Sequence, residues 1–105
     1  MVIVISVVFI VPSIIIESQE GKGDSWIFQV AVSDDEGALK FQVALEKEYW
    51  RDLTRESSTP MELVERSFKF LLEREPKESI LKRFNLKQIM AYFPEYEEEM
   101  KRNIP

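Results

Sequence analysis

The sequence predicts a single α+β domain, in which a three- to four-stranded antiparallel meander precedes four or five short helices. Two patterns carry this prediction. Apolar and polar side chains alternate in residues 13–45, whereas in residues 46–103 the apolar side chains recur at helical spacing and prolines interrupt them. A chain of 105 residues is long enough for one small domain, and we expect residues 1–105 to form only one.

The meander is expected to contain strands at residues 14–20, 26–33 and 39–45. Every second side chain of the two later strands is apolar, which is typical of a sheet with one buried face. Glycine and aspartate at positions 21–24 and 34–37 supply the turns, because both residue types tolerate positive φ. Short turns between consecutive strands predict antiparallel pairing.

The helical half is expected to begin with a helix at residues 46–53. Thr59 precedes a proline and stands three residues before a glutamate, a pattern typical of a helix N-terminus. Pro76 is expected to end this second helix and begin another, Asn85 to cap the next, and Pro94 to open the last. The helical side chains expected to face the core are Tyr49, Trp50, Leu53, Met61, Val64, Phe68, Leu71, Leu72, Ile80, Leu81, Phe84, Leu86, Ile89, Met90 and Phe93.

Residues 1–16 are almost entirely apolar, and they reach Glu17 before the roughly 20 residues that a membrane-spanning helix requires. No secretory signal is expected, because the segment shows neither a basic start nor a small-residue cleavage site. Its valine and isoleucine content favours a strand. We expect residues 2–11 to be covered by a partner chain or exchanged between subunits. The alternative is that translation begins later and that residues 1–12 are an extension.

The chain contains neither histidine nor cysteine, and this excludes several kinds of chemistry. A histidine general base, a cysteine nucleophile and the histidine and cysteine ligands of zinc are all missing. Three glycines in total leave no glycine-rich phosphate loop. We therefore expect no catalytic residue and no cofactor. The lack of disulfides favours the cytoplasm, and abundant Glu, Lys and Arg beside few Asn residues favour a thermophilic source.

One local excess of basic residues stands out in a chain of net charge −5. Its members are Lys77, Lys82, Arg83 and Lys87, and on a helix the last two would share a face because they are four residues apart. A solvated helix surface would explain this cluster, and a docking site for an acidic protein partner is the functional interpretation. The acidic total argues against extensive contact with the phosphates of DNA.

Two acidic runs offer oxygen ligands for a hard cation. Glu95, Glu97, Glu98 and Glu99 also suit the positive end of a helix dipole, and residues 34–36 lack the alternating spacing of a calcium loop. We therefore predict a helix start and a hairpin tip at these places, and no metal site. The aromatic side chains of the helical half are expected in the core, with a surface that stacks on bases or ligands as the alternative.

Residues 40–75 place the strand KFQVAL, the helix EKEYWRDL, a polar turn and the stretch TPMELVERSFKFLL in succession. This order resembles the ribbon-helix-helix family of DNA-binding regulators and antitoxins. The resemblance implies that two chains pair these strands into a ribbon, with Lys40, Gln42 and Ala44 facing the major groove and Thr59 near a phosphate. The chain departs from the family in its acidic charge, its short first helix and the turn that joins this strand to a preceding one.

Three strings between Trp26 and Met100 are EYWRDLT, TPMELVERSFKFLLEREPKESIL and YFPEYEEE. They are similar to a group of small prokaryotic proteins of no assigned function. This resemblance implies kinship and brings no activity or cofactor with it. We expect a non-enzymatic protein-binding or regulatory module that forms a homodimer and has no membrane partner. A ribbon-helix-helix-like regulator or antitoxin is the alternative.

Overall fold

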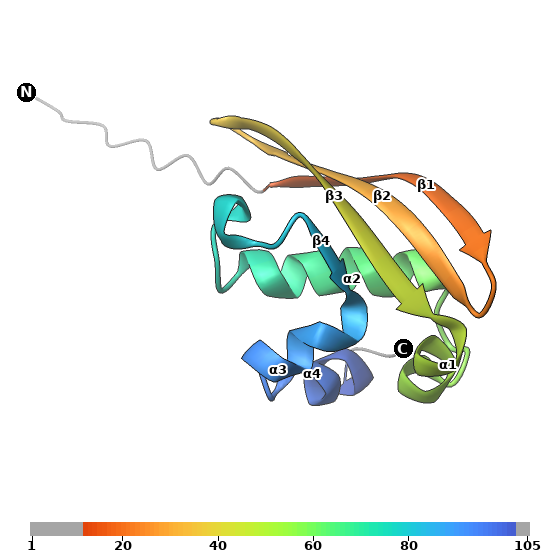
Figure 1. Ribbon diagram of the computed structural model, residues 1–105. Coiled ribbons are helices and arrows are strands. Elements are labelled where there is room, and N and C mark those ends of the chain that lie inside the picture. Colours follow the sequence, from red (N-terminus) through yellow and green to blue (C-terminus); the bar gives the residue numbers. More distant parts are fainter. Residues whose placement is uncertain (1–11, 103–105) are drawn as a thin grey trace, which may run out of the picture.

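The computed structural model describes residues 12–102, and its sheet begins with a meander of three long strands (Figure 1). These are β1 (Ser13–Lys22), β2 (Ser25–Asp34) and β3 (Gly37–Glu46), paired antiparallel in that order. A fourth short strand, β4 (Arg83–Asn85), pairs with β3 in parallel. The α+β class and the meander are confirmed, and the sheet is mixed rather than wholly antiparallel.

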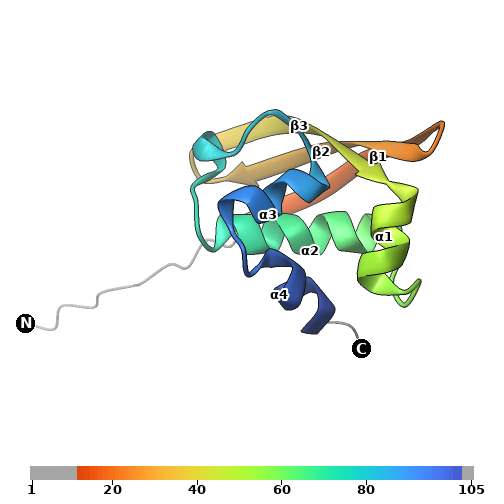
Figure 2. The same cartoon turned by 60° about the horizontal axis from the view of Figure 1, so that its bottom comes forward.

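The helices lie on one face of this sheet, and α2 runs across it (Figures 1 and 2). In chain order, the helices and short 3-10 turns are α1 (Lys47–Thr54), α2 (Pro60–Leu72), η1 (Lys77–Ser79), η2 (Leu86–Gln88), α3 (Ile89–Tyr92) and α4 (Tyr96–Arg102). Within the described part of the chain, no helix has the length and apolar character to cross a membrane.

The alternation of the two central strands produces one buried face. The side chains buried there are Phe28, Val30 and Val32 from β2, and Phe41, Val43 and Leu45 from β3. The two turns need backbone that glycine adopts easily, with φ of 58° at Gly23 and 126° at Gly37. The predicted hairpins and the predicted inner face are therefore confirmed.

The core forms where α2 packs against this inner face. Phe68 is fully buried, and its ring centroid lies 5.4 Å from that of Phe41 and 5.9 Å from that of Phe84. One polar contact is also buried: the hydroxyls of Ser67 and Tyr96 are 2.6 Å apart. Ser67 donates to the Leu63 carbonyl, so Tyr96 is the donor of the pair. This contact ties α4 to α2.

Two predicted helix caps are confirmed. The Thr59 hydroxyl accepts a hydrogen bond of 3.1 Å from the Glu62 amide at the start of α2. The Asn85 side chain accepts one of 3.0 Å from the Lys87 amide, and the Gln88 side chain accepts from the Asn85 amide at 2.7 Å. Such caps satisfy backbone donors that a helix leaves unpaired at its start.

The prediction of a helix after Pro76 is wrong. Only η1 is helical there, and the chain then runs extended into β4, where Phe84 lies opposite Val43 of β3. The spacing of Ile80 and Phe84 fits a helix, but both side chains also reach the core from an extended chain that follows the sheet edge. Hydrogen bonding to β3 decides between these two conformations.

Four side chains expected in the core are exposed. Met61, Met90 and Tyr92 retain 42%, 38% and 68% of their accessible surface. Leu81, also expected inside, retains 54%. The prediction that residues 2–11 are covered by a partner chain concerns a segment outside the described residues.

Candidate functional site

A pocket of about 400 Å³ opens between the C-terminal end of α2, the chain that follows η1, and the η2–α3 unit. Its apolar lining consists of Leu71, Ile80, Leu81, Phe84, Ile89 and Phe93. The remaining lining residues are Glu75, Ser79, Gln88 and Tyr92. This size and lining are those of a binding site for an apolar group. We call it the apolar pocket.

The pocket exists because the chain after η1 runs extended along the sheet edge into β4. A helix in this segment would follow another path. Ile80 and Ile89 are buried and form part of the wall, and Phe84 rests on Phe68 of the core. Leu81 and Tyr92 line the pocket and yet remain mostly exposed. Exposed apolar side chains gathered around a cavity are a common mark of an interaction site.

Three of the predicted basic partner residues are neighbours in sequence of residues that line the apolar pocket, and none of the three is itself part of the lining. Lys82 and Arg83 are exposed and lie in the chain between the lining residues Leu81 and Phe84. Lys87 is exposed, precedes Gln88 of the lining, and has its ammonium 6.0 Å from the Tyr49 ring centroid. We call Lys82 and Lys87 the basic rim, because Arg83 stands opposite Gln42 and so lies on the outer face of the sheet. Arg83 and Lys87 do not share a helix face, because Arg83 belongs to β4.

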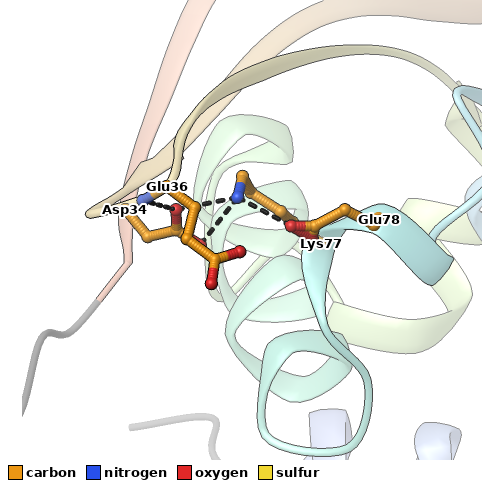
Figure 3. Close-up of polar contacts among 4 residues, drawn as sticks. All are labelled: Asp34, Glu36, Lys77 and Glu78. Atoms are coloured by element: carbon orange, nitrogen blue, oxygen red, sulfur yellow. Dashed lines mark hydrogen bonds and ion pairs between the residues drawn. The ribbon is translucent and has the colours of Figure 1, made fainter.

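Lys77 is not part of this exposed surface. Its side chain is only 4% exposed, and its Nζ lies 2.7 and 2.8 Å from the two carboxylate oxygens of Asp34 (Figure 3). The same Nζ donates to Glu78 at 2.9 Å. Lys77 therefore fastens η1 to the β2–β3 hairpin, and the prediction that places it on a partner surface is wrong.

These contacts shift the pKa values of all three groups. Hydrogen bonding to Asp34 and then to Glu78 raises the pKa of Lys77 above its usual range. The hydrogen bond from Lys77 holds the pKa of Asp34 and that of Glu78 below their usual ranges. The charged forms are thus favoured in the folded state, which makes this cluster a stabilising contact at neutral pH.

The variant Lys77→Met is expected to make the free energy of unfolding depend less on pH in the acidic range. Asp34 and Glu78 have lowered pKa values when folded, so they stabilise the wild type above their reference values of 3.8 and 4.5 and less as the pH falls. Lys77 contributes below its reference value of 10.5, and that contribution is lost at higher pH, as the pH passes its raised folded value. Without Lys77, the unfolding free energy should fall less steeply between about pH 5 and pH 3.

Urea unfolding at a series of pH values measures this slope. Lys82→Met is the matched control, because it removes an exposed lysine five positions further along the chain. The control should keep the wild-type slope. Equal slopes in Lys77→Met and Lys82→Met would show that the cluster does not couple stability to pH.

The predicted DNA-facing residues lie on the outer face of the sheet. Gln42 accepts a hydrogen bond of 3.3 Å from Gln29, and the ammonium of Lys40 lies 3.7 Å from the Glu17 carboxylate. The strand that carries them, β3, has β2 on one side and β4 on the other, and Arg83 is opposite Gln42. Over residues 42–44 both edges of β3 are thus occupied, so this part of the strand has no free edge for a ribbon shared between chains.

The acidic runs are engaged within the fold. Glu95 lies 3.2 Å from Arg74, Glu97 accepts a hydrogen bond of 2.8 Å from the Tyr49 hydroxyl, and Glu99 lies 3.8 Å from Arg102. Burial, followed by the bond to Glu97, raises the pKa of Tyr49 above its usual range. Among residues 12–102, no group of three or more carboxylates is placed to hold a metal ion.

Comparison with known proteins adds no relative. No family model matches the chain, and no curated protein or solved structure matches it. The two resemblances noted in the sequence therefore remain predictions. The apolar pocket itself was not predicted from the sequence, although the excess of large apolar side chains between residues 80 and 93 was a signal of it.

Proposed function

We propose that this protein is a non-enzymatic protein-binding module whose docking site is the apolar pocket. The observation that carries the proposal is that Leu81 and Tyr92 line the pocket while keeping 54% and 68% of their surfaces exposed. A small molecule inside the pocket would leave much of this surface in water. A protein partner covers it, as buried anchors at the centre of protein interfaces do.

The basic rim supports a partner with acidic residues. Lys82 and Lys87 adjoin the lining residues Leu81 and Gln88 in the chain, so carboxylates that flank an inserted apolar side chain would lie near positive charge, whereas Arg83 stands with Gln42 on the outer sheet face. Attraction of this kind guides association and selects among partners more than it adds affinity. The expected partner segment therefore has an apolar anchor flanked by aspartate or glutamate.

A non-enzymatic role is supported by the residues at hand. Glu75 and Tyr92 are the titratable members of the pocket lining, and the chain has no histidine or cysteine to join them. General acid–base catalysis needs a positioned pair with suitable pKa values. A cytoplasmic setting in a prokaryote fits the absence of cysteine.

Selection from a displayed library of random linear peptides tests this proposal. Wild-type protein is the target, and each enriched peptide is then tested for binding to Leu81→Glu and to Met61→Glu. The proposal expects enriched peptides with an apolar anchor and acidic neighbours that bind the wild type and Met61→Glu alike. Met61 is a suitable control because it is exposed at the opposite end of α2. Enrichment of peptides that bind all three proteins equally, or no enrichment, contradicts it.

The homodimer is proposed to form through the edge of β1. Within residues 12–102, no strand pairs with the outer edge of this ten-residue strand. Ile14 and Ile16 pack against the core, whereas Ile15 retains 54% of its surface. Unpaired apolar edges readily pair with another strand. Sedimentation should show a wild-type dimer that becomes a monomer in Ile15→Lys, and a wild-type monomer contradicts the proposal.

A DNA-binding regulator remains the alternative function. Lys40, Gln42 and Arg83 on the outer sheet face favour it, whereas the occupied edges of β3 at residues 42–44 and the net charge of −5 weigh against it. Anisotropy of labelled duplex DNA at low salt separates the two functions. The docking proposal expects no binding, and binding that falls steeply with salt and disappears in Lys40→Glu supports the regulator.

A further inference from the structure

We propose that residues 2–11 of the chain occupy the apolar pocket of the same molecule and leave it when a partner docks. The release of the segment by a partner rests on the proposed function, whereas the identity of the occupant does not. Residues 2–11 read VIVISVVFIV, with Ser6 as the only polar residue and no charge. A segment of this composition gains free energy by leaving water for an apolar site.

The start of β1 lies at the same end of the molecule as the pocket. Ser13 pairs with Ser33, and the neighbouring Asp34 is 2.7 Å from Lys77, which stands two residues before Ser79 of the pocket lining. Figures 1 and 2 both show the beginning of β1 at the end of the molecule where α2 ends. The segment therefore joins the domain next to one wall of the pocket.

The short connection favours occupation within one chain over exchange between two. Ten residues in extended conformation span roughly 33 Å at about 3.3 Å per residue, which is ample for a site at the same end of a small domain. A short tether also gives an effective concentration in the millimolar range, well above ordinary protein concentrations. A segment from a second copy would compete at a disadvantage.

This occupant differs from the proposed partner in charge. Residues 2–11 are uncharged and so fill only the apolar part of the site, leaving the basic rim free. A partner with acidic flanks contacts the same lining and also meets Lys82 and Lys87. The partner can therefore displace the segment, and the segment excludes apolar peptides without acidic flanks. Its effect is to raise the selectivity of the pocket.

A single engineered cysteine tests the proposal in the full chain. Because the native sequence has no cysteine, Val8→Cys provides one thiol whose rate of reaction with a water-soluble aromatic disulfide reports its exposure. We expect this rate to rise at least tenfold when Leu81→Glu is added and to stay unchanged when Met61→Glu is added. Equal rates in all three proteins overturn the proposal.

Two further readings complete the test. The reaction rate should not change on hundredfold dilution. A thiol that is protected only at high protein concentration would mean exchange between copies and would contradict occupation within one chain.

The change Val8→Asp should strengthen binding of library-selected peptides. Protection of the thiol without any selected peptide refutes the proposed function alone, whereas peptide binding with an unprotected thiol refutes only this inference.

Discussion

Phe68→Ala is expected to lower the free energy of unfolding by about 3–5 kcal/mol, the usual cost of removing a buried phenylalanine. Phe68 is fully buried and contacts the rings of Phe41 and Phe84. It thus joins α2, β3 and β4 in one cluster, and the cavity left by alanine touches all three. Urea unfolding at neutral pH measures the loss.

Tyr92→Ala is the control, since it removes an aromatic ring that is 68% exposed. Its effect should stay within about 0.5 kcal/mol, as for most surface substitutions. A loss below about 1 kcal/mol in Phe68→Ala would mean that the contacts of this ring do not hold the core together. Phe84 would then also lack the support on which the wall of the pocket depends.

Leu81→Glu is expected to weaken binding of a library-selected peptide roughly tenfold to a hundredfold. Burying a leucine side chain is worth about 1.5–3 kcal/mol, and each 1.4 kcal/mol is a factor of ten in affinity. The introduced carboxylate also repels the acidic flanks expected in the peptide. Because Leu81 is 54% exposed in the free protein, its replacement should leave folding almost unchanged.

Calorimetric titration gives this affinity, and two variants separate the causes. Leu81→Gln removes the apolar contact without adding charge, so it should lose affinity at all salt concentrations, but less than Leu81→Glu at low salt. Met61→Glu adds a charge far from the pocket and should bind like the wild type. An equal loss in Met61→Glu and Leu81→Glu would place the peptide elsewhere.

The sheet was predictable because its signals are local. Alternation in residues 26–33 and 39–45 specifies the buried face, and the turns at Gly23 and Gly37 specify the antiparallel order. Thr59 and Asn85 likewise cap the elements that follow them. Each of these features depends on residues a few positions apart, which sequence patterns report well.

The segment after Pro76 was not predictable in the same way, because contacts with distant residues determine it. Lys77 is held by Asp34, 43 positions earlier in the chain, and β4 exists through pairing with β3. Both the mistaken helix and the mistaken exposure of Lys77 come from these contacts. The apolar pocket lies beside the same segment, so it could not be predicted before the path of this chain was known.

The central claim is that a partner docks in the apolar pocket. Amide chemical-shift mapping of the full chain, titrated with a library-selected peptide, tests it most directly. We predict that the largest shifts fall on Leu71, Ile80, Leu81 and Ile89 around the pocket, with smaller ones on the basic rim. Shifts concentrated on β1 or on the outer sheet face around Gln42 would contradict the claim.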